Sequence, residues 1–210
     1  MTNTQQSPIN LTNAILADFG NKLSIKWKKS ANGKIKKDEH GVQIEFGGDQ
    51  RQYIEVDHKQ FHLVKFHFHH PSEHWLDGVQ QTMELHIVHQ NIDDGSRVVL
   101  GVFIEPSPSA KAVPSLVSQL RLFFSARDKD ADPSISTNPL DWLPKDTKHY
   151  FRYEGSLTTP DYDENVSWVV FKDSLRISKT ELMKLIPYLL HPARSPQPLN
   201  RRFLLANFRA

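Results

Sequence analysis

Cysteine is absent from this 210-residue sequence, which excludes disulfide bridges, thiolate metal ligands and cysteine nucleophiles. The sequence also lacks an apolar run of the ~18 residues that a membrane-spanning helix needs. Its opening stretch, MTNTQQSPIN, carries no apolar segment of the kind found in signal peptides. We therefore expect no membrane partner, and a cytoplasmic chain as given; it would be periplasmic or secreted if a signal peptide has been removed.

A strong charge of either sign is absent too. The 26 basic and 24 acidic residues leave a formal net charge of +2, so we expect no nucleic-acid partner. Lysines do gather between positions 22 and 37: Lys22, Lys26, Lys28, Lys29, Lys34, Lys36 and Lys37. Because lysine on a strand edge discourages aggregation, we interpret them as a solvated edge, with a polyanion-binding patch as the alternative.

The remaining pattern predicts one mainly β (α+β) domain over residues 1–210, since a chain of this length can bury roughly 70% of its unfolded surface in a single core. Alternation of apolar and polar residues, or an apolar run between turn residues, predicts strands at 23–28, 40–46, 53–56, 61–69, 83–89, 97–104, 149–153 and 166–171.

A few segments predict helices, a turn and a loop instead of strands. Apolar residues at helical spacing predict a helix over 111–124, and a capping box at 178–181 predicts another that ends near Pro187. Asn32-Gly33 is typical of a tight turn, and the composition of 132–144 predicts a surface loop.

The stretch from Lys65 to Gln90, KFHFHHPSEHWLDGVQQTMELHIVHQ, holds the residues with the clearest chemistry. Successive side chains of an extended strand point to opposite faces, so His67 and His69 share one face. The same alternation in MELHIVH places His86 on one face of the next strand. If these two strands pair antiparallel, the three imidazoles converge on one point.

Three imidazoles with no evident fourth protein ligand predict an open tetrahedral zinc site that keeps one position for water. Zinc lowers the pKa of that water to about 7 and so supplies hydroxide at neutral pH. Glu84, two residues before His86 on the same face, is placed to hold the second ring nitrogen of a ligand. Cupin-type metal sites share the HxH pattern, and Glu73 could be the carboxylate ligand of such an iron or manganese site.

Six short motifs follow one another along the chain: QSPIN at 6–10, FHFHHPSEH at 66–74, ELHIVH at 84–89, GSLTTP at 155–160, VSW at 166–168 and QPLN at 197–200. Together and in this order they resemble an α-class carbonic anhydrase. The resemblance implies a single domain on a large twisted, mostly antiparallel β-sheet with a few peripheral helices. It also implies a Zn²⁺ cofactor, carbon dioxide and bicarbonate as small-molecule substrates, inhibition by sulfonamides and small anions, and a homodimer as in many bacterial relatives.

The resemblance assigns further roles. His40 aligns with the histidine that carries protons between zinc-bound water and solvent, a role that suits an ordinary histidine pKa near 6.5. Glu73 aligns with a buried carboxylate that takes the proton of a threonine hydroxyl, here Thr158, whose oxygen then accepts from zinc-bound hydroxide. Hydroxide attacks carbon dioxide, and bicarbonate exchanges for water. The substrate pocket is implied around Val88, Val99, Leu157, Thr159 and Trp168.

The sequence departs from the family pattern at Lys65, where a glutamine carbonyl usually accepts a hydrogen bond from the first histidine ligand. Lysine only donates, so His67 needs another acceptor or is held less firmly, and such a loss typically costs roughly ten- to a hundredfold in metal affinity. Asp161 also replaces a common proline after LTTP, and the aromatic segment that precedes QSPIN in the family has no counterpart.

Three other functions are compatible with these residues. A non-catalytic carbonic-anhydrase-related binding module is the first, and the presence of all three histidines argues against it. A cupin-like metal enzyme is the second, and the identity of the metal discriminates it. The third is an esterase, which the same zinc hydroxide would support.

Overall fold

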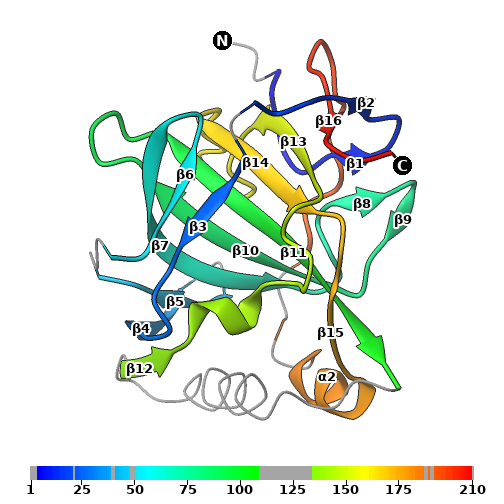
Figure 1. The fold of residues 1–210 in the computed structure, drawn as a ribbon. Coiled ribbons are helices and arrows are strands. Elements are labelled where there is room, and N and C mark those ends of the chain that lie inside the picture. Colours follow the sequence, from blue (N-terminus) through cyan, green and yellow to red (C-terminus); the bar gives the residue numbers. More distant parts are fainter. Residues whose placement is uncertain are drawn as a thin grey trace.

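The structure is a computed structural model that describes residues 4–20, 22–38, 41–47, 51–108, 134–186, 189 and 192–209. Strands dominate these residues (Figure 1). The elements are Asn10–Leu11 (β1), Ile15–Leu16 (β2), Ser24–Lys26 (β3), Ala31–Asp38 (β4), Gly41–Glu45 (β5), Tyr53–Val56 (β6), Lys59–His69 (β7), Trp75–Leu76 (β8), Val79–Gln80 (β9), Met83–Gln90 (β10), Arg97–Ser107 (β11), Ser134–Thr137 (β12), the 3₁₀ helix Pro139–Trp142 (η2), Tyr150–Gly155 (β13), Val166–Phe171 (β14), Leu175–Ser178 (β15), Lys179–Leu185 (α2) and Leu205–Ala206 (β16).

One large twisted sheet organises the molecule (Figure 1). Its strands follow the order β12-β4-β5-β7-β10-β11-β14-β13-β16-β2, and β3, β6 and β15 pair off this path. Most neighbours are antiparallel, whereas β11 runs parallel to β14 and β15, and β16 runs parallel to β2. A small second sheet joins β1, β8 and β9. The predicted mainly β class on a mostly antiparallel sheet is confirmed; the single domain over 1–210 stays a prediction.

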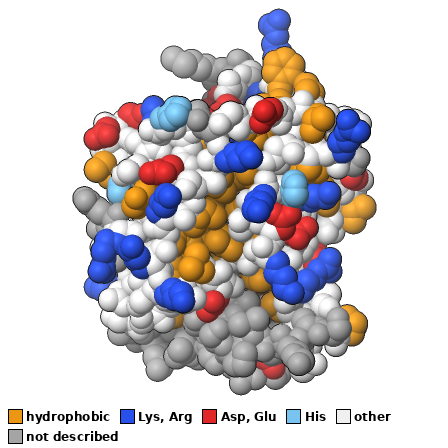
Figure 2. Space-filling model, in the orientation of Figure 1, with side chains coloured by type: hydrophobic (Ala, Val, Ile, Leu, Met, Phe, Trp, Pro, Cys, Tyr) orange, Lys and Arg blue, Asp and Glu red, His pale blue; other side chains and the backbone are white. Residues whose placement is uncertain are grey.

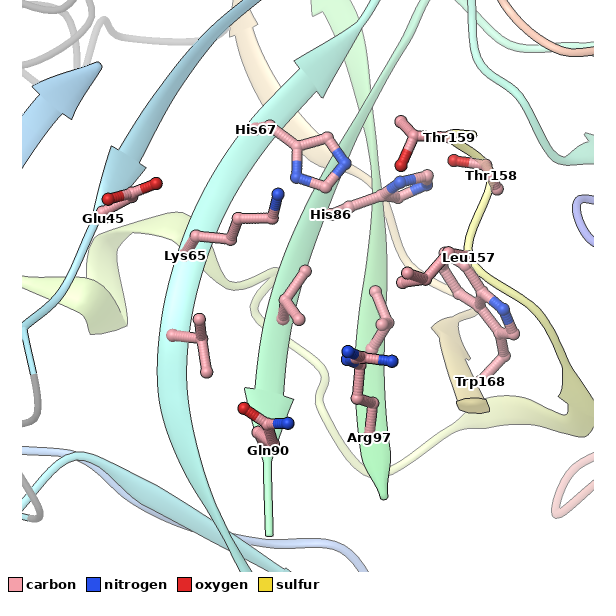
Figure 3. A pocket seen from close by; sticks show the side chains of 13 residues that line it. Glu45, Lys65, His67, His86, Gln90, Arg97, Leu157, Thr158, Thr159 and Trp168 are labelled. Atoms are coloured by element: carbon pink, nitrogen blue, oxygen red, sulfur yellow. The ribbon is translucent and has the colours of Figure 1, made fainter. Parts of the chain in front are cut away.

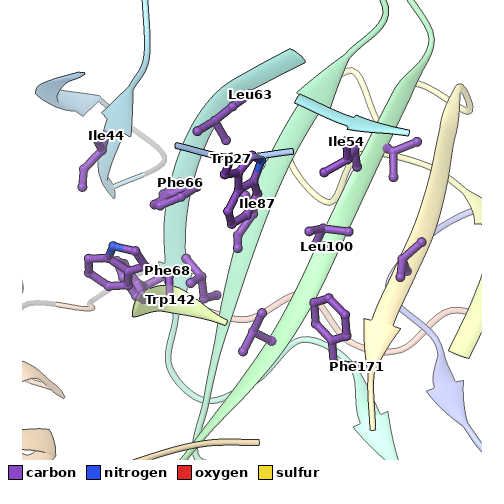
Figure 4. Close-up of a cluster of buried hydrophobic side chains, with 14 of the residues drawn as sticks. Trp27, Ile44, Ile54, Leu63, Phe66, Phe68, Ile87, Leu100, Trp142 and Phe171 are labelled. Atoms are coloured by element: carbon purple, nitrogen blue, oxygen red, sulfur yellow. The ribbon is translucent and has the colours of Figure 1, made fainter. Parts of the chain in front are cut away.

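The central strands are buried on both faces. Leu85 and Ile87 of β10 pack with Phe66 and other aromatic side chains in the larger apolar cluster (Figure 4). Val88 of the same strand packs into a second cluster with Trp168 on the opposite face. Each such side chain stabilises the fold by about 1.5–3 kcal/mol when it leaves water. Strand β10, which carries His86, is therefore packed between two apolar clusters.

A β-bulge interrupts the pairing of β7 with β10. Val88 pairs with Lys65 and His89 pairs with Leu63, so that Val64 is an extra residue on β7. Bulges re-aim the side chains of the strand that carries them. As a result the consecutive residues Val64 and Lys65 both line the same cavity, although strict alternation would send them to opposite faces.

The turn predicted at Asn32-Gly33 is wrong, because both residues lie inside β4. A Cβ atom on Gly33 would stand 2.8 Å from Ile44 Cγ2 and 2.9 Å from the carbonyl oxygen of Glu45 on the neighbouring strand. The missing side chain thus allows a close strand approach rather than a turn.

Two further predictions concern the second half of the chain. The loop predicted over 132–144 is wrong in part, because β12 and η2 form within it. The side chain of Asn138 accepts from the backbone N–H of Leu140 and so caps η2. Helix α2 follows Ser178 as predicted, but the side chain of Ser178 makes no capping hydrogen bond, so the predicted capping box does not form. The helix predicted over 111–124 lies outside the described residues.

The exposure of the lysines between positions 22 and 34 agrees with the predicted solvated edge. Lys22, Lys26, Lys28, Lys29 and Lys34 are exposed. Figure 2 shows lysine and arginine side chains spread over one face with acidic side chains between them. Among the described residues, no helix is both long and apolar enough to cross a membrane.

Candidate metal centre and its pocket

The antiparallel pairing of β7 with β10 brings the three predicted metal ligands together. His67 lies opposite His86, and His69 lies opposite Glu84. The ring centroids are 5.0 Å apart for His67 and His69, 5.1 Å for His67 and His86, and 4.5 Å for His69 and His86. One nitrogen of each ring lies within 4.8 Å of the others, which suits three ligands of one ion.

Burial favours the neutral form of His67 and His69. Desolvation holds the pKa of His67 well below its usual value, and the nearby His69 and His86 lower it further. Desolvation also lowers the pKa of His69 to about 4, against the opposing effect of Glu73. Metals bind the neutral imidazole, and Nε2 of His69 is buried without a hydrogen-bond partner among the described residues. The donor set therefore fits a metal ion.

Glu84 lies beside His86, the third predicted ligand. Its Oε1 lies 3.0 Å from Nε2 of His86 and 2.7 Å from Nδ1 of His74. Its Oε2 accepts the backbone N–H groups of Glu73 at 3.0 Å and His74 at 2.8 Å. Burial acts to raise the pKa of Glu84, but His74 and His86 hold it well below its usual range. The carboxylate thus fixes the His86 ring and the backbone around Glu73 at once.

A buried chain of hydrogen bonds continues from His74. Its Nε2 lies 2.7 Å from the hydroxyl of Tyr153, which donates to Oγ of Ser7 at 2.9 Å. Ser7 and Ser156 are joined twice, because the backbone N–H of each donates to the hydroxyl of the other, at 2.9 and 3.1 Å. The QSPIN and GSLTTP motifs therefore meet. The sequence did not reveal the role of Tyr153, since its position in an alternating strand predicts only burial.

Glu73 and Thr158, the predicted orienting pair, are both buried. Oε1 of Glu73 accepts from the backbone N–H of Arg194 at 3.0 Å, and Oε2 is buried without a hydrogen-bond partner among the residues described. Oε2 also lies 3.5 Å from Nε2 of His69. Thr158 is buried and lines the cavity. The hydrogen bond between Thr158 and Glu73 stays a prediction, with Oε2 as its acceptor.

A cavity of about 270 Å³ opens onto the histidines (Figure 3). Its lining is Glu45, Val64, Lys65, His67, His86, Val88, Gln90, Arg97, Val99, Leu157, Thr158, Thr159 and Trp168. All five residues predicted for the substrate pocket are among them. Lys65 lies there because it shares the strand face of His67, whereas Glu45, Gln90 and Arg97 were not predicted there, because the strand ends that place them have no clear sequence signal. His40 lies outside the described residues, so its role stays a prediction.

Lys65 leaves the first ligand without support, as its donor-only side chain predicts. Its Nζ donates to Oε1 of Gln43 at 2.9 Å, and Nε2 of Gln43 donates to Glu45 at 3.3 Å. Nδ1 of His67 is buried and has no hydrogen-bond partner in the described part of the chain. Asp161, the other departure, is exposed and stands outside the cavity lining.

The C-terminal segment binds the QSPIN motif beside the site through several hydrogen bonds. Arg194 donates to the carbonyl of Ser7 at 2.7 Å and to Oε1 of Gln6 at 2.9 Å. Arg202 donates to the carbonyl of Gln6 at 2.8 Å. The backbone N–H of Gln197, in QPLN, donates to the carbonyl of Pro8 at 2.7 Å. Neither arginine was predicted, since only the fold shows that these distant segments touch.

Cavity size does not identify the site. A larger cavity of about 930 Å³ lies between the segment 16–25 and residues 147–150. Its lining contains none of the three predicted metal ligands. The convergence of the histidines, and not the volume, singles out the smaller cavity as the candidate site.

Comparison with known proteins agrees with this geometry. The family model of the eukaryotic-type carbonic anhydrases matches residues 1–210. A carbonic anhydrase of Nostoc sp. is 32% identical over 79% of this chain and 61% of its own, so the chain spans about three fifths of that relative. Carbonic anhydrase 7 of Mus musculus is 31% identical over 98% of this chain and 89% of its own.

A solved structure agrees as well. The α-carbonic anhydrase of Thermovibrio ammonificans, in complex with the inhibitor sulfanilamide, superposes with a TM-score of 0.82 at 32% identity. The match covers 96% of this chain and 86% of that one. The chain belongs to the eukaryotic-type, or α-class, carbonic anhydrase family of enzymes.

Proposed function

We propose that this protein catalyses the reversible hydration of carbon dioxide to bicarbonate and a proton, with Zn²⁺ held by His67, His69 and His86. The observation that carries the proposal is the group of three converging imidazoles at a cavity with an apolar wall. When bound by three histidines, zinc supplies hydroxide at neutral pH by lowering the pKa of water to about 7. The family match supports this assignment over a cupin-like iron or manganese site.

Each residue around the histidines has a separate task in this proposal. Oε1 of Glu84 lies 3.0 Å from Nε2 of His86, which leaves the other ring nitrogen for the metal. Oε2 of Glu73 accepts the hydroxyl proton of Thr158. The Thr158 oxygen can then only accept, which orients the attacking oxygen toward the substrate.

The apolar wall receives carbon dioxide, which is small and carries no net charge. Val88, Val99 and Leu157 line one cavity with Trp168. Val88, Val99 and Trp168 are almost completely buried, so their positions are fixed by the second apolar cluster. Such a wall excludes ordered water and binds the substrate weakly, which favours rapid turnover. The proton leaves through His40 in this proposal.

Stopped-flow hydration of carbon dioxide by the zinc-loaded protein tests the proposal. We expect rapid hydration that sulfanilamide abolishes, because the inhibitor bound by the Thermovibrio enzyme would compete for the same position. The control is His69→Ala, which removes one ligand and should lose both zinc and activity.

The zinc content must be measured on the same samples. Wild-type protein that holds one zinc ion and hydrates no faster than background would refute the proposed reaction and favour a non-catalytic binding module. Stoichiometric iron or manganese, with zinc excluded, would refute the proposed metal.

A further inference from the structure

We propose that Tyr162 is a positioning residue for the metal pocket: its ring holds the side chain of Arg194, and through Arg194 it fixes the orienting pair Glu73 and Thr158. Tyr162 itself lies outside the cavity lining and outside the histidine group, so it acts only through its neighbours. This inference rests on the proposed function, because it is that reaction which needs Glu73 and Thr158 in one arrangement.

The ring of Tyr162 packs flat against a guanidinium group. Cζ of Arg194 lies 3.9 Å from the centre of the ring, a distance typical of a cation–π contact. The edge of the same guanidinium donates to the carbonyl of Ser7 at 2.7 Å and to Oε1 of Gln6 at 2.9 Å. Both side chains are half-buried. One aromatic face and two acceptors therefore restrict the Arg194 side chain to one orientation.

The backbone of Arg194 holds Glu73. Its N–H donates to Oε1 of Glu73 at 3.0 Å. Oε2 lies 3.5 Å from Nε2 of His69 and has no hydrogen-bond partner within the described ranges. A carboxylate that is held by one oxygen presents the other in a defined direction. Because Oε2 is the proposed acceptor of the Thr158 proton, a shift of the Arg194 backbone would turn this acceptor away.

Tyr162 also belongs to the loop that carries Thr158. The backbone N–H of Tyr162 donates to the carbonyl of Thr159 at 3.0 Å, and the N–H of Leu157 donates to the carbonyl of Asp163 at 3.0 Å. These two hydrogen bonds close the loop on itself around Thr158. A change in the conformation of Tyr162 is therefore passed on to the neighbours of Thr158 in the chain.

The conformation of this loop depends on outside contacts. The φ angles are 75° for Asp161 and 46° for Tyr162, in the left-handed region that residues other than glycine rarely adopt. Such a conformation persists where the surrounding structure enforces it. Two contacts do so here: the ring of Tyr162 packs on Arg194, and its carbonyl accepts from Nε2 of Gln6 at 3.1 Å. Removal of the ring leaves the loop free to relax.

Amide hydrogen exchange of the metal-free protein, followed by NMR, measures the Arg194 hydrogen bond without metal or turnover. Wild type, Tyr162→Ala and Tyr162→Phe are compared at Arg194 and at Gly95, whose amide closes a separate surface turn on Asn91 at 3.1 Å. We expect Tyr162→Ala to speed exchange at Arg194 by about two- to thirtyfold, the range of a cation–π contact, and to leave Gly95 unchanged. Tyr162→Phe keeps the ring and should match wild type at both amides.

Stopped-flow hydration by the zinc-loaded proteins tests whether this coupling serves the reaction. Tyr162→Ala should lower kcat by about two- to thirtyfold with little change in KM, because the affected contacts orient the attacking oxygen and do not bind carbon dioxide. Tyr162→Phe should keep most of the wild-type rate. Arg194→Met removes the guanidinium but keeps the backbone N–H, and in this background Tyr162→Ala should have no further effect, since both changes remove the same contact.

The other outcomes separate the two proposals. Equal exchange at Arg194 in wild type and Tyr162→Ala would overturn the link between the ring and Glu73, and faster exchange at Gly95 as well would show that Tyr162 only stabilises the whole fold. Faster exchange at Arg194 with an unchanged kcat, or a loss in Tyr162→Phe as large as in Tyr162→Ala, would refute the positioning role. Wild-type zinc protein that hydrates no faster than background would instead refute the proposed function, and the exchange rates would still show whether Tyr162 fixes Glu73.

Discussion

Replacing Lys65 with glutamine should tighten zinc binding. Nδ1 of His67 is buried without a partner among the described residues, and a buried donor left unsatisfied costs about 1–3 kcal/mol. A glutamine carbonyl at position 65 would accept from this nitrogen, and Lys65 cannot. We expect the zinc dissociation constant of Lys65→Gln to fall by roughly ten- to a hundredfold, or about 1.4–2.7 kcal/mol.

Two effects contribute, and a matched variant separates them. Lys65→Met removes the positive charge that repels the metal but offers no acceptor to His67. Competition with a chromophoric zinc chelator at pH 7.5 gives the dissociation constant of each protein, and stopped-flow transfer of zinc to excess chelator gives the release rate. The ratio between Lys65→Gln and Lys65→Met isolates the hydrogen bond. If the two variants bind zinc equally, the missing acceptor has no effect and the reasoning from the unpartnered nitrogen is wrong.

Four further changes test other parts of the structure. Burial lowers the pKa of His89 to about 3, so below pH 6.5 the unfolded chain binds more protons than the folded one, and stability is lost as the pH falls. In urea titrations of metal-free protein, His89→Leu should reduce the slope of the unfolding free energy against pH by up to about 1.4 kcal/mol per pH unit. Glu84→Gln should destabilise the protein by about 1–3 kcal/mol in urea unfolding, because an amide cannot accept all the hydrogen bonds that the buried carboxylate accepts from His74 and from the backbone N–H groups of Glu73 and His74; it should also weaken zinc binding in chelator competition. Thr158→Val should slow stopped-flow hydration by roughly a hundredfold at unchanged zinc content, whereas Thr158→Ser should keep most of it; equal losses would contradict a role for the hydroxyl. Gly155→Ala should lower the thermal midpoint by several degrees, because its Cβ would collide with Oγ of Ser7; an unchanged midpoint would mean that the contact relaxes.

The metal ligands could be predicted from the sequence because strand alternation is a local property. His67, His69 and His86 each face the site as period-two geometry requires. The role of Glu84 follows from the same alternation. These predictions depended only on the residues of the same two strands and not on the rest of the chain.

Residues that reach the site from distant segments could not be predicted in this way. The backbone N–H of Arg194 holds Glu73 across a separation of 121 residues, and Tyr153 joins His74 across 79 residues. No periodicity encodes such contacts. Val64 illustrates a second limit, since only the bulge explains why it lines the cavity together with Lys65.

The role of Gly33 was also predicted wrongly from a local pattern. Asn32-Gly33 is typical of a hairpin turn, yet Gly33 sits within β4 where a side chain would collide with β5. A turn and a close strand approach both require the smallest residue, and the sequence alone does not tell them apart.

The contrast between local and distant contacts has a consequence for the order of events in folding. The three metal ligands belong to one neighbouring strand pair, β7 and β10, so that pair can bind the ion as soon as it forms. The catalytic surroundings come later, because Ser7 must meet Ser156 and Arg194, which are 149 and 187 residues away. During refolding, zinc uptake should therefore precede the appearance of activity, and the delay between them should measure the time that the two ends of the chain take to find each other.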